Sequence, residues 1–396
     1  MPASGPFLAP FMRIHANSWT GQNRMKIAEI KAIPLTMPIA PGEHRTWWGD
    51  YPSISIILVE VTTDEGIKGY GEGLARYCPQ SYGLMIENLL APRYIGQDPF
   101  AVEALWQRAF RIHSGKSGGM MMEAISAIDI ALWDIMGKAL NQPIHRLLGT
   151  YGRTEVEAYA SSISWSAEEK AAEQIEAATA MGFKMIKAKL GAPADEAIAW
   201  CRKVREMVRS DIKLCADANF AYDLDDAIRV ARALHELDFY WLEEPIAPED
   251  IDGYKRLRAA SPMRIVAGES EHTTFGAREI IASRAVGMIQ PDCTRAGGIT
   301  ETRKIANLAY AFNVGYAPHI GGGGAISSAA NLQLSAAMPN FTIFESMIFP
   351  SALRDQLATE PVGAIDTRTG LVPVPQGPGL GIELDFDMVE KLRSEG

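Results

Sequence analysis

The chain has 396 residues and a mass of 43.2 kDa, a length that suits two or three domains, or one barrel with a companion domain. Its hydrophobic fraction of 47% and charged fraction of 22% are those of a folded globular protein, which excludes a chain that is disordered as a whole. The formal net charge of −10 argues against a nucleic-acid partner, since such proteins present a basic face. No apolar run reaches about 18 residues, so we expect no membrane-spanning segment.

The first 24 residues give little indication of structure. Their apolar patch, Phe7 to Met12, is interrupted by Pro10 and is too short for the core of a signal peptide. We therefore expect residues 1–24 to be a loose extension, or Met25 to be the natural start. The four cysteines form no Cys-x-x-Cys pair, which argues against a zinc ribbon or a redox motif. We interpret them as the reduced thiols of a cytoplasmic protein.

Residues 25–150 mix strands and helices, which predicts an α+β domain. A β-rich run at 54–61 ends at a turn, and a second strand at 68–72 follows at hairpin distance. Between residues 119 and 148, apolar side chains recur at three- and four-residue steps, which indicates one buried helix face.

After about residue 151, short β-branched runs alternate with alanine-rich helical stretches. The candidate strands repeat about every 26 residues, at 155–163, 185–190, 212–219, 239–244, 264–269, 287–292, 313–319 and 341–345. Candidate helices lie between them, for example at 167–181, 223–237 and 298–312. This alternation predicts a (β/α) barrel. The alternative, an open doubly wound sheet, would need a Gly-x-Gly-x-x-Gly turn near its first strand, and the sequence has none there.

An acidic cluster opens the candidate helix at 223–237. It consists of Asp223, Asp225 and Asp226. We interpret it as a helix N-cap with an acidic first turn rather than as a metal site.

Three carboxylates end three successive strands: Asp217, Glu243 and Glu269. A barrel gathers the carboxyl ends of its strands on one face, so these side chains should share a cavity. Three carboxylates in one cavity repel one another unless a cation joins them. Oxygen ligands without His or Cys favour Mg²⁺ over zinc. We predict one Mg²⁺ per active site here; the alternative is that each acid caps a helix or pairs with a nearby lysine.

The second strand ends in Lys187 and Lys189. A step of two residues in a strand puts both side chains on one face. Two close ammonium groups lower each other's pKa, and burial lowers it further, which suits a general base near neutral pH. The alternative is two solvated lysines at a strand end.

Asp292 and His319 end adjacent strands on the other side of the expected barrel mouth. A carboxylate beside an imidazole fixes its tautomer and raises its basicity, so this pair predicts a second base. The glycine run 321–324 after His319 is not followed by Lys and Ser or Thr, so it is not a phosphate-binding loop. Glu345, on the eighth strand, is a candidate to donate a proton or a hydrogen bond to a developing enolate, with helix capping as its alternative. We expect the other histidines, such as His113, His145 and His235, to be core or surface residues.

Together these groups define one kind of reaction. A substrate carboxylate binds the metal, a base removes the proton from the adjacent carbon, and the metal stabilises the resulting enediolate. Return of a proton from the other face gives racemisation or epimerisation, whereas loss of a 3-hydroxyl with histidine as the acid gives dehydration. A non-catalytic binding protein on the same fold is an alternative of a different class, but no expected catalytic residue is missing. The all-carboxylate set disfavours a zinc hydrolase.

These residues resemble the enolase superfamily and, within it, the mandelate racemase subgroup. The resemblance covers about residues 25–396 and includes three stretches outside the barrel, at 66–72, 131–139 and 377–382. It implies three structural parts. They are an α+β capping domain at 25–150, a (β/α)₇β TIM-type barrel at 151–355, and a segment at 356–396 that returns to the cap.

The resemblance also implies a role for each strand-end residue. Lys189 corresponds to the base on one face, Lys187 to its carboxylate-binding neighbour, and Asp292 with His319 to the opposite dyad. Asp217, Glu243 and Glu269 correspond to the metal ligands, Glu345 to the acid of strand eight, and Asn219 to a position near the substrate. Most subgroup members with this set resemble acid-sugar dehydratases, lyases that convert an aldonate or aldarate to a 2-keto-3-deoxy acid. The alternatives within the subgroup are a racemase or epimerase and a sugar-lactone cycloisomerase, and a homo-oligomer is expected.

We expect residues of the capping domain to determine substrate specificity, and residues 38–50 are a candidate lid. Within it, Arg45 is a candidate to bind a second carboxylate or a distal hydroxyl. Trp47 and Trp48 are candidates to exclude water from the site. The alternative is a mobile surface loop.

Overall fold

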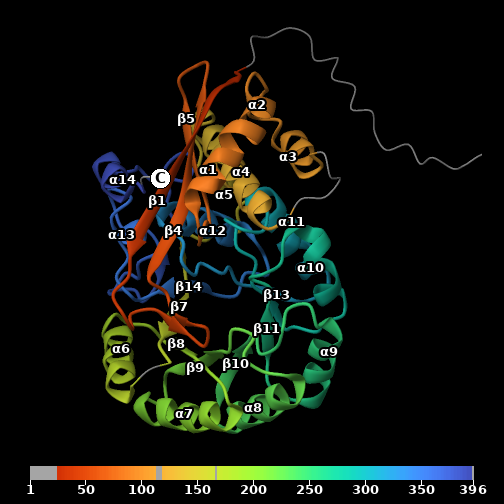
Figure 1. The fold of residues 1–396 in the computed structure, drawn as a ribbon, viewed down its shortest axis with the longest axis vertical. Coiled ribbons are helices and arrows are strands. Elements are labelled where there is room, and N and C mark those ends of the chain that lie inside the picture. The colour runs from red at the N-terminus through yellow and green to blue at the C-terminus, as the bar shows by residue number, and fades with distance from the viewer. Residues whose placement is uncertain (1–24, 113–117, 166, 395–396) are drawn as a thin grey trace, which may run out of the picture.

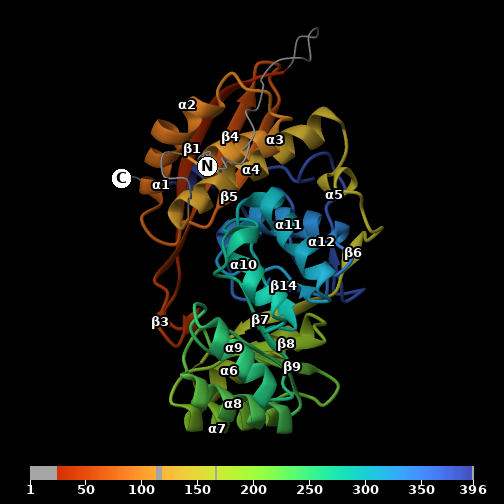
Figure 2. The same ribbon diagram turned by 90° about the vertical axis from the view of Figure 1, so that its right-hand side faces the viewer.

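The structure is a computed structural model that describes residues 25–112, 118–165 and 167–394. The predictions for residues 1–24 and for His113 lie outside the described residues. A capping layer stands over a barrel, as Figures 1 and 2 show from two directions. No helix in the described part of the chain is long and apolar enough to cross a membrane.

The capping layer is a three-stranded antiparallel sheet covered by helices. Its strands lie in the order β1 (Ile27–Pro38), β4 (Ser53–Thr63) and β5 (Lys68–Gly73). The small hairpin of β2 (Arg45–Thr46) and β3 (Gly49–Asp50) lies between β1 and β4 in the chain. The helices of this layer are α1 (Pro79–Met85), the π-helical turn η1 (Ile86–Leu90), α2 (Ala91–Tyr94), α3 (Val102–Phe110), α4 (Met120–Ala139) and α5 (Ile144–Leu147).

Helix α4 lies directly on β5 because β5 carries glycines where the two backbones meet. A Cβ atom added to Gly71 would come within 1.8 Å of the Ala127 carbonyl oxygen. The alternating glycines of the run 69–73 therefore permit a close helix–sheet contact that a side chain would prevent.

The barrel is one eight-stranded parallel sheet. In chain order its strands are β7 (Ala158–Ile163), β8 (Met185–Lys189), β9 (Lys213–Asp217), β10 (Phe239–Glu243), β11 (Ile265–Ala267), β12 (Met288–Ile289), β13 (Gly315–Tyr316) and β14 (Phe344–Met347). β14 pairs with β7. A parallel bridge between Tyr316 and Phe341, just before β14, closes the ring. The intervening helices are α6 (Glu168–Ala180), α7 (Ala194–Met207), α8 (Leu224–Glu236), α9 (Ile251–Ala260), α10 (Thr273–Ala282), α11 (Gly298–Ala311) and α12 (Ala325–Ala337).

The fold class is therefore the predicted (β/α)₇β TIM-type barrel with an α+β cap. The three helices named from the sequence are present as α6, α8 and α11. Asp223 is the predicted N-cap, since its side chain accepts a hydrogen bond from the Asp226 amide.

One predicted strand, at 155–163, is wrong in its extent. Residues Glu155–Val156 form a separate strand, β6, which pairs with β15 (Val372–Pro373) of the C-terminal segment and not with the barrel. The sequence pattern does not distinguish the two pairings, because residues that favour strands suit either sheet.

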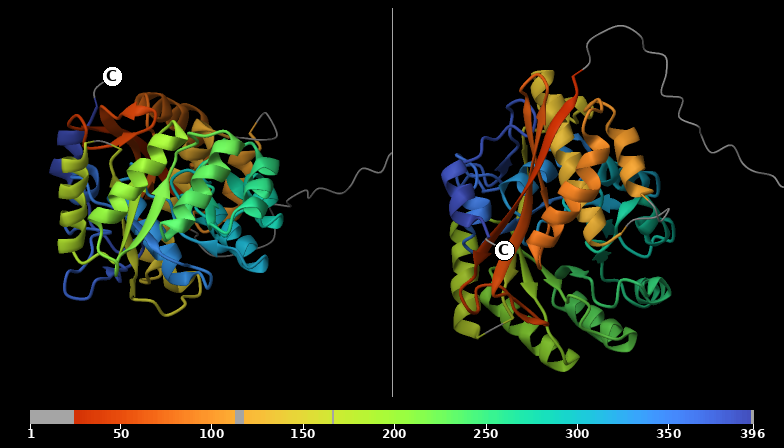
Figure 3. Two further views of the ribbon diagram at one scale, coloured as in Figure 1. Left: turned by 90° about the horizontal axis from the view of Figure 1, so that it is seen from below. Right: turned by 45° about the horizontal axis from the view of Figure 1, so that its top comes forward.

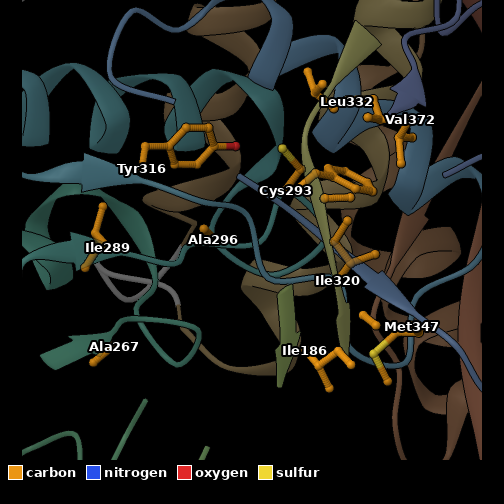
Figure 4. Close-up of a cluster of buried hydrophobic side chains, with 14 of the residues drawn as sticks. Ile186, Ala267, Ile289, Cys293, Ala296, Tyr316, Ile320, Leu332, Met347 and Val372 are labelled. Carbon is orange, nitrogen blue, oxygen red and sulfur yellow. The ribbon is translucent and has the colours of Figure 1, made fainter. Parts of the chain in front are cut away.

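Period-two alternation fixes which side chains point into the barrel. On β8, Ile186 belongs to the outer core between sheet and helices, which Figure 4 shows together with Ala267 of β11 and Ile289 of β12. Met185 instead belongs to a separate interior layer, in which each strand or its flank supplies one residue. This layer consists of Tyr159, Met185, Cys215, Trp241, Val266, Met288, Ala317 and Ile343. It fills the interior below the strand ends, so Lys187 and Lys189, in step with Met185, point inward above it.

The C-terminal segment returns to the cap. It follows α13 (Ala352–Asp355) and contains β15 and α14 (Phe386–Leu392). The Ser394 amide donates to the Pro34 carbonyl oxygen at 3.0 Å, and Arg393 bridges Leu35 of β1. The right-hand view of Figure 3 shows these blue helices beside the red strand.

A buried carboxylate joins the cap to the barrel next to the glycine run 321–324. Glu72 of β5 accepts hydrogen bonds from the Gly324 amide at 2.7 Å and the Ser327 amide at 3.1 Å, at the start of α12. Its burial raises its pKa to about 7, although these two amides oppose the shift. The folded chain therefore holds a proton at Glu72 that an unfolded chain, with a pKa near 4.5, releases.

This shift predicts a pH-dependent stability. The contribution of Glu72 to the free energy of unfolding is fully present below pH 4.5 and is lost as the pH rises through about 7. At 1.36 kcal/mol per pKa unit, the loss is about 3 kcal/mol. Glu72→Gln cannot ionise and should lack this loss. Urea midpoints measured between pH 4.5 and 8 should therefore fall more steeply for the wild-type chain than for the variant. Parallel pH profiles for the two proteins would show that Glu72 has an ordinary pKa.

Candidate active site

A cavity of about 80 Å³ lies between the barrel mouth and the cap. A water molecule needs about 10–15 Å³ on this scale, so the cavity holds several groups of that size. Its barrel wall includes Lys187, Lys189, Asn219, Glu269, His319 and Glu345. Its cap wall includes His44, Thr46, Trp48, Tyr51, Ser55 and Arg76.

The three predicted metal ligands meet below this cavity. Asp217 ends β9, Glu243 ends β10, and Glu269 follows β11 by two residues. One oxygen from each carboxylate lies within 4.8 Å of the others, and all three side chains are buried. This set of hard oxygen donors fits a single divalent cation such as Mg²⁺ and lacks the nitrogen or sulfur ligands that zinc prefers.

The charges around these carboxylates are strongly coupled. Burial alone would raise the pKa of Asp217, but the ammonium groups of Lys189 and Lys187 outweigh it and lower the pKa to about 2. For Glu243, burial prevails over Lys187 and raises the pKa to about 7. Glu243 is also held by Gln290, whose Nε2 donates to its Oε2 at 2.8 Å. The structure thus fixes the orientation of these carboxylates with side chains that hydrogen-bond to them.

Both lysines of β8 point toward the carboxylates. Lys187 Nζ lies 2.5 Å from Glu243 Oε1 and 2.9 Å from Glu345 Oε1. Lys189 forms an ion pair with Asp217 and donates to Asn219 Oδ1 at 3.2 Å. The prediction that the two share one face is confirmed.

The predicted direction of their pKa shift is wrong for this structure. Burial lowers the pKa of Lys189, and so does Lys187, but Asp217 raises it further, so the pKa lies above the ordinary value. The pKa of Lys187 is raised for the same reason, with Glu243 as the main counter-charge. Two ammonium groups alone would lower each other's pKa. The strand ends, however, bring more carboxylates than lysines to the barrel mouth. A divalent cation bound to the carboxylates would offset that negative charge.

Asp292 and His319 form the predicted pair. His319 Nδ1 lies 3.0 Å from Asp292 Oδ2, and Nε2 lies 3.4 Å from Glu269 Oε2. Burial would lower the pKa of His319, but Glu269 and Asp292 raise it above 6.5. Asp292 is oriented by the backbone amide of Thr294 at 2.8 Å. Around the closed ring, two strands in one direction and four in the other separate β13, which leads to His319, from β8, so the imidazole and Lys189 approach the mouth from different sides.

Glu345, the predicted acid of the eighth strand, lies beside Lys187 at the mouth. Burial would raise its pKa, but Lys187 and His319 lower it below the ordinary value. The carboxylate accepts hydrogen bonds from Ser161 Oγ at 2.6 Å and from the Ile320 amide at 2.8 Å. These contacts let Glu345 position Lys187 and the chain after His319, and its role as a donor to a developing enolate stays a prediction.

The three predicted substrate-binding residues lie in different places. Asn219 and Trp48 both line the cavity, and Trp48 Nε1 donates to the Asn219 carbonyl oxygen at 2.8 Å, which joins the lid to the barrel. Arg45 does not line it. Its side chain is exposed, with Nε 3.8 Å from Asp50 Oδ1. Because β2 is a strand, Arg45 points away from the face on which His44 and Thr46 contact the cavity.

Sequence reasoning missed most of the cap wall. Arg76, three residues after β5, lies 3.9 Å from Glu269 Oε1. Tyr51 and Ser55 contribute hydroxyl groups. The hydroxyl-bearing residues of the run 51–55, which leads from the lid into β4, are the sequence feature that could have indicated this wall. The position of Arg76 depends on how cap and barrel dock and has no local pattern.

A closed parallel barrel with three buried carboxylates, a lysine pair and a histidine–aspartate pair at its mouth defines an enzyme of the enolase class. Residues 38–149 match the family described as mandelate racemase / muconate lactonizing enzyme, N-terminal domain, and residues 170–388 match the family described as enolase C-terminal domain-like. The chain belongs to this family, the mandelate racemase subgroup of the enolase superfamily.

Characterised relatives and a solved structure resemble the chain over most of its length. It is 35% identical to an arabinonate dehydratase of Saccharolobus solfataricus, over 86% of this chain and 91% of the relative. It is 34% identical to a D-galactarolactone cycloisomerase of Agrobacterium fabrum, over 85% and 91%. The crystal structure of a racemase from Streptomyces coelicolor A3(2) with bound magnesium matches with a TM-score of 0.85 and 29% identity, over 93% of this chain and all of that chain.

Proposed function

We propose that the chain is a Mg²⁺-dependent acid-sugar dehydratase that forms a 2-keto-3-deoxy acid from an aldonate or aldarate. The observation that carries the proposal is the placement of two proton-transferring side chains, Lys189 and His319, on different sides of one cavity above three buried carboxylates. The dehydratases and the cycloisomerase among the relatives support chemistry on acid sugars.

Asp217, Glu243 and Glu269 would hold the metal. When bound, Mg²⁺ supplies Lewis-acid stabilisation of the negative charge that develops on the substrate carboxylate. The relative with bound magnesium and the all-oxygen donor set support this assignment.

The remaining residues divide the proton transfers between two sides. Lys189 takes the proton from the carbon next to the carboxylate, and Lys187, fixed by Glu345, adds positive charge beside that carboxylate. Asp292 holds His319 Nδ1, which leaves Nε2 to deliver a proton to the departing 3-hydroxyl. The cap and the lid exclude water from this step.

A library of aldonates and aldarates, with semicarbazide detection of 2-keto products, tests the proposal. We expect Mg²⁺-dependent keto product from at least one member of the library. Metal binding without turnover of any member would contradict the dehydratase assignment.

A sugar-lactone cycloisomerase is the second candidate, and the 34% identity to such an enzyme favours it. It begins with the same proton abstraction, but its substrate is a sugar lactone and not an open-chain acid. Turnover of sugar lactones but of no aldonate or aldarate would support the cycloisomerase, whereas proton NMR in D₂O that shows exchange at carbon two without keto product would support a racemase or epimerase.

The proposal also includes the binding partners of the chain. The substrate is a small carboxylate, and the chain assembles into a homo-oligomer. Light scattering of the purified protein tests the second statement.

A further inference from the structure

The imidazole of His44 forms part of the cap wall of the cavity and belongs to none of the catalytic groups described above. Only 8% of the residue is exposed. The ring lies against Tyr51, with centroids 4.7 Å apart, and against Phe349, with centroids 5.0 Å apart. The Tyr51 amide donates to the His44 carbonyl oxygen at 3.1 Å. These contacts fix both the backbone and the ring plane of His44.

One ring nitrogen of His44, Nδ1, is buried and forms no hydrogen bond with any residue that the structure describes. By contrast, His145 Nδ1 lies 2.8 Å from Gln333 Oε1, and His319 Nδ1 lies 3.0 Å from Asp292 Oδ2. A buried polar atom without a partner is destabilising, so its presence beside a cavity requires an explanation. A half-turn about the Cβ–Cγ bond exchanges Nδ1 with Cδ2 and Nε2 with Cε1 without moving the ring plane, so each nitrogen has two positions from which it can meet a ligand.

The environment keeps this imidazole neutral. Burial is the main cause, followed by the positive charges of Lys189 and Arg76, and together they lower the pKa of His44 to about 3. A neutral imidazole offers one donor and one acceptor. A hydroxyl group is also both donor and acceptor, whereas a carboxylate only accepts. The chemistry of His44 therefore matches a sugar hydroxyl better than a second carboxylate.

We propose that His44 is a specificity-determining residue that hydrogen-bonds a hydroxyl of the substrate beyond the reacting carbons, and so selects polyhydroxy acids over acids with an apolar tail. Thr46 and Tyr51, which also carry hydroxyl groups, line the same cavity. This inference rests on the proposed function, and it assigns to His44 the recognition role that the sequence suggested for Arg45.

Calorimetric binding in the presence of Mg²⁺ tests the assignment. The probes are C5 and C6 aldonates and their analogues that lack one hydroxyl beyond carbon three. The wild-type chain should bind the full polyol about 10- to 100-fold more tightly than one deoxy analogue. His44→Phe keeps an aromatic ring against Tyr51 and Phe349 but should reduce this ratio to near one. His44→Gln keeps a donor and an acceptor and should restore part of it, while Arg45→Gln, an exposed neighbour, should leave it unchanged.

Each outcome either supports or overturns the role of His44. Unchanged discrimination in His44→Phe would overturn it, and so would an equal loss of affinity for all acids, which would mean that His44 only shapes the lid. Tighter wild-type binding of an arylhydroxy acid than of any aldonate would also overturn it. If no acid of the panel binds the wild-type chain, the proposed function fails and this inference with it. If keto product forms but discrimination does not change, only the His44 assignment fails.

Discussion

Lys189→Ala should lower kcat for any acid that the enzyme converts by about 10³-fold, because it removes the base from one side of the cavity. The variant should remain folded, because Lys187 Nζ lies 3.4 Å from Asp217 Oδ2 and still balances the charge of this buried carboxylate. The interior layer below the site, to which Met185 of the same strand belongs, is also untouched. Steady-state kinetics with saturating Mg²⁺ measures the effect.

Lys184→Ala is the matched control. Lys184 is an exposed residue immediately before β8, at the opposite end of the strand from the cavity. The same substitution there should leave kcat within about twofold, as for most surface changes. An equal loss in both variants would mean that the charge of the strand, and not the position of Lys189, determines activity.

Loss of the metal site should abolish activity altogether. Mg²⁺ at 100 times its dissociation constant should stabilise the wild-type chain by about 2.7 kcal/mol, and chelation should reverse this. Asp217→Ala removes one of the three ligands, so the Mg²⁺-dependent rise in Tm and the activity should both disappear. Differential scanning calorimetry with and without Mg²⁺ reads the binding separately from turnover.

Asp225→Asn provides the control, because this acid lies exposed in the first turn of α8 and does not belong to the three buried ligands. It should keep the full Mg²⁺ response. A response that persists in Asp217→Ala would mean that the cation binds elsewhere on the chain and would contradict the assignment of the three carboxylates.

The barrel and the candidate catalytic residues at its mouth could be predicted from the sequence. Both follow from two regular patterns, the alternation of side chains along a strand and the even spacing of the strands along the chain. Alternation along β8 places Lys187 and Lys189 on one face, and the regular strand spacing brings Asp217, Glu243 and Glu269 to the same mouth. Neither inference needs the loops to be known. Even a strand as short as β12 (Met288–Ile289) leaves Asp292 in place, because its neighbours β11 and β13 fix its register.

The charge states and the cap wall could not be predicted in this way. The pKa of Lys189 depends on how many carboxylates converge around it, which only the folded barrel determines. The cap reaches the mouth through long-range contacts such as that of Glu72 with the Gly324 amide. Local sequence patterns contain no information on such docking. They therefore point to the exposed Arg45, and not to Arg76 and His44, which line the cavity.

Deuterium exchange at carbon two of a converted acid tests the central claim most directly, because it reports proton abstraction apart from the later steps. In D₂O with Mg²⁺, the wild-type enzyme should exchange this proton and form keto product. His319→Asn should keep the exchange but lose dehydration, since Lys189 still takes the proton and no acid assists the departing hydroxyl. Lys189→Ala should lose both. Exchange that survives in Lys189→Ala, or that is absent from His319→Asn, would contradict the assignment of the two sides of the cavity.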